Sequence, residues 1–180
     1  MSRGRHTRAP WRPDVPALHF VVPGDPATRT GGYAYDRRIA AGLRTLGWTV
    51  HVHRLGDGFP QPSPAARAHA GAVLAALPDG ARVLVDGLAL GALPEAAERE
   101  SDRLRLVALV HHPLAAETGL AATRAAALRD TERRALAAVG RVIVTSRATA
   151  HALAAYDVAA DRIAVVEPGT DAAPLARGSG

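Results

Sequence analysis

The chain has 180 residues, of which 48% are hydrophobic, and a formal net charge of +5. This length fits one domain with a core of its own. The absence of cysteine excludes a disulfide framework and a thiolate metal site, and it favours a reducing compartment.

The positive charge is concentrated at the N-terminus. Residues 1–16 hold four arginines against Asp14, which accounts for +3 of the net charge of +5. The chain contains no lysine, a bias that we attribute to coding rather than to phosphate binding. We therefore interpret residues 1–16 as a disordered basic tail, with no nucleic-acid partner and at most a weak contact with an anionic membrane. No secretory signal or apolar run of roughly 18 residues is visible, so we expect a cytoplasmic protein.

Six apolar stretches alternate with helical patterns along the chain. Strands are expected at residues 17–22, 48–55, 82–86, 104–110, 141–145 and 162–166. Helices are expected from Gly31 to about Gly47, over 64–77, on both sides of Pro94, over 120–138 and from Ser146 to Tyr156. In the first helix Ile39, Leu43 and Leu46 predict the apolar face, and Asp36 is expected on the polar side.

This alternation predicts an α/β fold, a Rossmann-like doubly wound parallel sheet of about six strands with helices on both faces. The domain should span residues 17–170. Residues 171–180 are expected to form a linker to a further domain. The strand ends should share one edge of the sheet; they are Val22, Asp86, Val110, Thr145 and Val166.

Two features of the sequence mark that edge as a candidate site. His111 and His112 follow the most apolar strand, and ligands of open α/β sheets bind at the carboxyl ends of the strands. Both histidines could equally cap the strand. Gly31 and Gly32 open a helix after the first strand, as a phosphate-binding loop or as a tight turn. Neither a dinucleotide fingerprint nor a P-loop is present.

Further titratable groups occur away from the predicted strand ends. Glu132 lies on the apolar stripe of its helix, where we expect it to pair with Arg129. His51 and His53 share one face of the second strand, and we interpret them as packing or surface residues. No zinc-binding spacing is present, and we predict no metal and no other cofactor.

Four groups of residues, in order along residues 17 to about 175, resemble the N-terminal domain of glycosyltransferase family four, the retaining enzymes of the GT-B fold. They are Gly31-Gly32 before a helix ending in LRTLGWTV, the strand end LVHH, the helix and strand TERRALAAVGRVIVTS, and the segment VVEPGTD.

The resemblance implies a two-domain enzyme in which this chain forms the acceptor side of a cleft, and an absent C-terminal domain grips a nucleotide-sugar donor. The acceptor remains unknown. The catalytic candidates are His111 and His112, and which of them faces the cleft stays open. A neutral imidazole of His111 is expected beside the transferred sugar. The candidates for binding the substrate or the diphosphate are Gly31, Gly32, Ser146 and Asp171, with Glu132 in support.

Two alternatives belong to other classes of protein. The chain could be a non-catalytic Rossmann-like module that binds a phosphorylated metabolite through its glycine loop. It could also be a truncated remnant with an interaction or structural role.

Overall fold

The computed structural model describes residues 15–171. They form one six-stranded sheet, all parallel, in the order β2-β1-β3-β4-β5-β6. The strands are β1 (Ala17–Val22), β2 (Thr49–Arg54), β3 (Arg82–Asp86), β4 (Arg105–Val110), β5 (Arg141–Val144) and β6 (Ile163–Val165). The predicted fold class is confirmed. The predicted tail and linker fall almost entirely outside the described residues.

Six α-helices and three short 3-10 turns connect the strands in this part of the chain. The helices are α1 (Gly31–Thr45), α2 (Pro64–Ala75), α3 (Gly87–Leu90), α4 (Pro94–Glu100), α5 (Ala122–Ala137) and α6 (Arg147–Ala152). The helix predicted to reach Tyr156 stops at Ala152 and continues as a 3-10 turn. Among the described residues, no helix combines the length and the apolar character that crossing a membrane requires.

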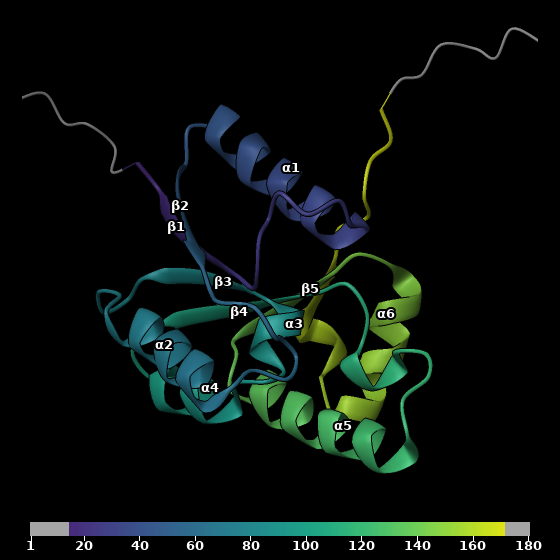
Figure 1. Cartoon of the computed structure of the whole chain (residues 1–180). Helices are drawn as coiled ribbons and strands as arrows, with labels where there is room; N and C mark the ends of the chain where they lie inside the picture. Colours follow the sequence, from purple (N-terminus) through teal and green to yellow (C-terminus); the bar gives the residue numbers. More distant parts are fainter. Residues whose placement is uncertain (1–14, 172–180) are drawn as a thin grey trace, which may run out of the picture.

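Helices lie on both faces of the sheet, but not evenly (Figure 1). The connection through α1 runs from β1 outward to β2, whereas all later connections run the opposite way across the sheet. Because crossovers between parallel strands are right-handed, the two directions place their helices on opposite faces. In Figure 1, α1 therefore lies on one face, and α2, α4 and α5 lie on the other.

The sheet separates two apolar clusters. The larger cluster lies on the face of α2, α4 and α5 and includes Leu74, Ala97 and Leu136. The smaller cluster joins α1 to the sheet through Phe20 and Tyr35. Valine and leucine fill most of both clusters, as expected for strands that are covered on both faces.

The end of α1 and its polar side differ from the prediction. Leu46 is 76% exposed, because α1 ends at Thr45 and Leu46 is its C-cap. Asp36 is only 2% exposed, although it was expected on the polar side. It lies four residues before Ala40, which is also buried against the sheet, so the two share one side of the helix.

The predicted alignment of strand ends is confirmed. The register pairs Val21 with Val85, and Val110 with Val144, so the strands end at one level. The N–H of Val166 donates to the carbonyl of Val144 at 2.8 Å, which holds the residue after β6 at the same edge. The first turn of α1 begins above this edge.

Candidate functional site

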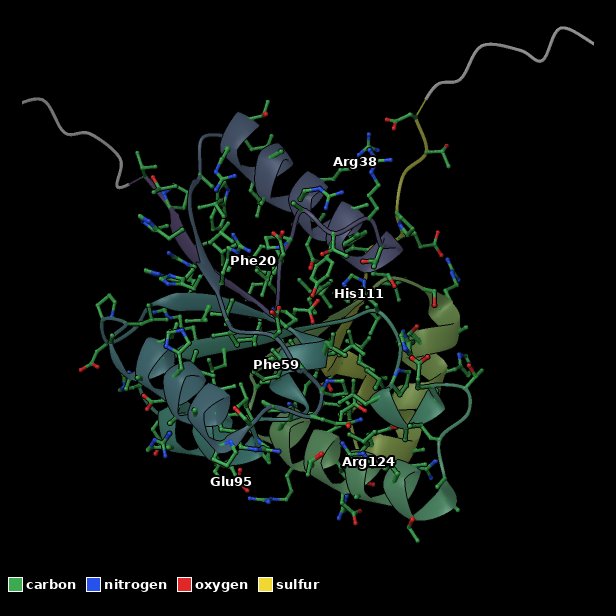
Figure 2. All side chains as sticks on the ribbon, viewed as in Figure 1. Phe20, Arg38, Phe59, Glu95, His111 and Arg124 are labelled. Atoms are coloured by element: carbon green, nitrogen blue, oxygen red, sulfur yellow. The ribbon has the colours of Figure 1, made fainter. Side chains whose placement is uncertain are left out.

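His111 lies at the carboxyl end of β4, beneath the first turns of α1 (Figure 2). Its carbonyl accepts hydrogen bonds from the hydroxyls of Thr145 at 3.3 Å and Thr149 at 3.0 Å. The Tyr35 ring packs edge-on against the imidazole, with 5.5 Å between the ring centroids. The backbone and the ring plane of His111 are therefore both held from neighbouring elements.

Two buried carboxylates face the His111 ring. Its Nε2–H donates to Oδ1 of Asp36 at 3.2 Å and lies 3.4 Å from Oδ2 of Asp86. Asp36 comes from α1, and Asp86 ends β3 and caps α3 by accepting the N–H of Leu88. The side chains of Asp36 and Asp86 are 2% and 5% exposed, so solvent screens these interactions weakly.

The three groups shift each other's protonation. Burial lowers the pKa of His111, but the hydrogen bonds to Asp36 and Asp86 outweigh burial and raise it overall. Burial raises the pKa of Asp36, the hydrogen bond from His111 lowers it, and repulsion from Asp86 raises it further. The two carboxylates thus favour the imidazolium form of His111, whereas the sequence led us to expect a neutral ring. They are far from His111 in sequence, and only the fold brings them to it.

A cavity of about 250 Å³ lies at this edge of the sheet. Its lining residues are Thr30, Gly32, Tyr33, Asp86, Leu88, His111, His112 and Leu114. Gly32 permits a close approach, since a Cβ there would lie 3.4 Å from Cδ2 of His111. A larger cavity of about 480 Å³ lies between α1 and the sheet, but almost all of its lining is apolar. We place the candidate site at the smaller cavity, because Asp86, His111 and His112, which can exchange protons, all line it.

The other predicted site residues occupy different surroundings. His112 lines the cavity, is 56% exposed and pairs with Glu117 at 3.2 Å. Gly31 is the first residue of α1 and does not line the cavity. The hydroxyl of Ser146 caps α6 by accepting the N–H of Thr149 at 3.0 Å. Asp171 forms an exposed ion pair with Arg38, which is also labelled on α1 in Figure 2. The fold thus brings Gly32, His111 and His112 together around the cavity, whereas Ser146 and Asp171 do not line it.

Glu132 supports the loop that follows the histidines. Its Oε2 accepts the N–H of Leu114 at 2.9 Å, and its side chain is almost completely buried. The predicted pairing with Arg129 was wrong, because Arg129 instead lies over the ring of Tyr156, 6.0 Å from the centroid. Burial raises the pKa of Glu132 to about 7, although the Leu114 N–H and the Tyr156 hydroxyl act in the opposite direction.

The sequence analysis missed Asp36 and Asp86 as site residues. Asp86 was predicted at the right edge of the sheet, and its position at a strand end was a usable signal. Asp36 gave a weaker signal, since it stands one turn after the glycine pair among charged neighbours. Both residues contact His111 only in the folded chain, so local sequence patterns do not predict these contacts.

Fold and site together define a Rossmann-like domain whose reactive groups meet at the carboxyl edge of a parallel sheet. Residues 86–173 match the family model described as Glycosyltransferase Family 4. No curated protein matches the chain. The resemblance found in the sequence is therefore confirmed over this stretch, which is similar to a domain of the glycosyltransferase type. The matched stretch includes Asp86, both histidines and Glu132, while α1 with Gly32 and Asp36 precedes it.

Proposed function

We propose that this domain forms the acceptor side of a retaining glycosyltransferase, which transfers a sugar from a nucleotide-sugar donor to an acceptor. The observation that carries the proposal is His111, which lines a cavity at the carboxyl edge of the sheet within the matched residues 86–173. A second domain would bind most of the donor nucleotide. The absence of cysteine suits a cytoplasmic location.

In this proposal His111 acts by position and charge. The carboxylates of Asp36 and Asp86 fix its ring, so that it meets the substrate in one orientation. A cationic ring offers positive charge to an oxygen on which negative charge develops. We assign no proton abstraction to His111, since the leaving phosphate of the donor can serve as base in a retaining reaction.

The start of α1 would complete the polar wall opposite His111. The helix carries a partial positive charge at its N-terminus, which favours a phosphate oxygen there. The hydroxyl of Thr30 already accepts the N–H of Tyr33 at 3.2 Å, so it is committed to capping the helix. Gly32, without a side chain, lets this turn approach the imidazole closely, so the backbone of the helix start and the ring line the same cavity.

The experiment compares His111→Ala with His69→Ala in the enzyme made from the complete gene, with a labelled nucleotide sugar as donor. His69 is an exposed histidine of α2, away from the cavity. His111→Ala should lower kcat by about 10²-fold, the scale of a lost transition-state contact, with little change in the KM for the donor. His69→Ala should retain the parent rate.

Two results would contradict the proposal. One is the absence of sugar transfer and of donor hydrolysis with all common nucleotide sugars, for a folded enzyme. The other is a His111→Ala enzyme that transfers sugar at the parent rate. Binding of a phosphorylated metabolite without any transfer would instead support a non-catalytic module.

A further inference from the structure

Tyr35 contacts two parts of the molecule that are far apart in sequence. It lies in the first turns of α1, and its ring packs edge-on against the imidazole of His111, with 5.5 Å between the ring centroids. Its hydroxyl donates a hydrogen bond to the carbonyl oxygen of Val166 at 2.9 Å, 131 residues away in the chain. We propose that Tyr35 is a positioning residue, which couples the orientation of the His111 imidazole to the position of the segment that follows β6.

Val166 is the first residue after β6, and both of its backbone polar groups are hydrogen-bonded. Its N–H donates to the carbonyl of Val144 at 2.8 Å, and its carbonyl accepts the hydroxyl of Tyr35. The first hydrogen bond joins Val166 to the sheet, and the second joins it to α1. The chain is therefore held between the helix and the sheet where it leaves β6, and Figure 1 shows the following segment passing alongside α1.

The donor of this hydrogen bond is a buried group. Tyr35 is 8% exposed, and it lines the apolar cavity of about 480 Å³ between α1 and the sheet together with Val166. Burial, and then the nearby charge of Asp36, raise the pKa of the Tyr35 hydroxyl above its usual value. The hydroxyl therefore keeps its proton throughout the neutral pH range and remains able to donate. Water competes for this donor less than for one on the open surface.

The same helix carries two further contacts that bear on the coupling. Asp36 follows Tyr35 directly, and its Oδ1 accepts the Nε2–H of His111 at 3.2 Å. Arg38 forms an exposed ion pair with Asp171, in the segment after β6. Because exposed ion pairs contribute little, we expect the hydrogen bond of Tyr35 to be the more important link between α1 and that segment. A displacement of the segment would therefore reach His111 through neighbouring residues of one helix.

The consequence for catalysis rests on the proposed function. In that function the segment after β6 leads toward the second domain, and His111 acts through the orientation of its ring. Tyr35 does not line the 250 Å³ cavity of the candidate site, so it acts through His111 rather than on the substrate. Loss of its hydroxyl should therefore affect the rate of transfer and not the binding of the donor.

The first test needs no sugar transfer. Purified residues 1–180 are compared with the Tyr35→Phe variant, which loses the hydroxyl and keeps the ring. Amide hydrogen exchange at Val166 should become about 2- to 10-fold faster, as expected for the loss of one hydrogen bond. The ring NMR signals of His111 should shift in the same variant. The control is Tyr33→Phe, which removes a hydroxyl that donates to the carbonyl of Pro23 at 2.9 Å and should leave the exchange of Val166 unchanged.

The second test uses the enzyme made from the complete gene. Tyr35→Phe should lower kcat about 2- to 10-fold and leave the KM for the donor unchanged. Combined with His111→Ala it should cause no further loss, because the two residues act as a unit. If the complete enzyme transfers no sugar at all, the proposed function fails, whereas the exchange and NMR data still decide the coupling.

Three results would each overturn the proposal. In the first, Tyr35→Phe leaves either the exchange of Val166 or the ring signals of His111 at wild-type values. In the second, Tyr33→Phe accelerates the exchange of Val166 equally. In the third, Tyr35→Phe slows the His111→Ala enzyme by the same factor as the parent enzyme. If Tyr35→Phe does not fold, the wild type decides, since nuclear Overhauser contacts should join the Tyr35 ring to the His111 ring and to Val166, and the absence of either contradicts the coupling.

Discussion

Glu132 shows how a single carboxylate can hold a site loop and also limit stability. Its Oε2 fixes the N–H of Leu114, three residues after His111, while Oε1 is buried without a hydrogen-bond partner among the described residues. Ionisation of a side chain that is 1% exposed is unfavourable, which is why its pKa rises to about 7. Between pH 4.5 and about 7, the folded protein therefore keeps a proton on Glu132 that the unfolded chain has already released.

Replacing Glu132 with Gln should change how the stability of the protein depends on pH. The stabilising contribution of the bound proton is complete below pH 4.5 and is lost as the pH rises toward about 7. Relative to Glu132→Gln, the wild type should lose roughly 2 to 3 kcal/mol of unfolding free energy between pH 4.5 and 8. Urea denaturation of both proteins across this range measures the difference.

The control for Glu132→Gln is Glu98→Gln, which removes a charge from an exposed carboxylate of α4. That variant should follow the wild-type pH dependence much more closely. Parallel curves for the wild type and Glu132→Gln would show that Glu132 is not protonated in the folded state near pH 6.

At the scale of elements, the close contact between α3 and β4 positions Asp86 beside His111. Gly87 follows Asp86 directly and begins α3. A Cβ at Gly87 would lie 3.0 Å from the carbonyl oxygen of Leu109 and 3.3 Å from the Cα of Val110. Both atoms belong to the backbone of β4, which cannot move without disturbing the strand that leads to His111.

We expect Gly87→Ala to destabilise the protein by about 1 to 3 kcal/mol, as overpacking of a core does. The matched change is Gly42→Ala in α1, where an added Cβ would meet no atom within 4 Å. That variant should be stabilised by about 0.5 to 1 kcal/mol, because alanine loses less conformational freedom in a helix than glycine. Denaturant melts of both variants test the pair, and a neutral Gly87→Ala would contradict the close contact.

At the scale of the whole molecule, the candidate site is a small cavity at the carboxyl edge of the sheet. Its volume of about 250 Å³ is smaller than the roughly 300 to 1,000 Å³ of typical ligand sites. Polar groups line it from α1 and from the ends of β3 and β4. Transfer of a sugar requires a site that orients the donor and excludes water, for which a second wall is needed.

We therefore expect residues 1–180 alone to bind nucleotide sugars weakly and to transfer no sugar. Calorimetric titration with several nucleotide sugars, together with an assay for released nucleotide, measures both quantities. Robust transfer by a preparation free of any longer enzyme would show that this domain is sufficient for catalysis.

Much of the architecture follows from local pattern. The runs of Val and Leu in β1, β3 and β4 predict strands covered on both faces, and their bounds agree with the structure to within one residue. Alternation of strands and helices then determines a parallel sheet, because parallel neighbours need crossover connections. The position of His111 at the carboxyl edge follows from that topology alone.

The surroundings of His111 could not be predicted in this way. Asp36 lies 75 residues from His111 in the chain, and its hydrogen bond to the ring exists only after α1 packs on the sheet. Helical periodicity placed Asp36 on the polar side, but the tilt of α1 against the sheet decides which side chains are buried. The charge of the imidazole, the pairing of Glu132 with Leu114 and the oxygen of Asp36 that lacks a hydrogen-bond partner among the described residues are likewise properties of packing.

The sequence by itself determined the order of strands and helices along the chain and the edge of the sheet that carries the site, because these follow from local periodicity and chain connectivity. Tertiary structure alone decided which charged groups meet there, since burial and electrostatic contact depend on distances between segments remote in sequence.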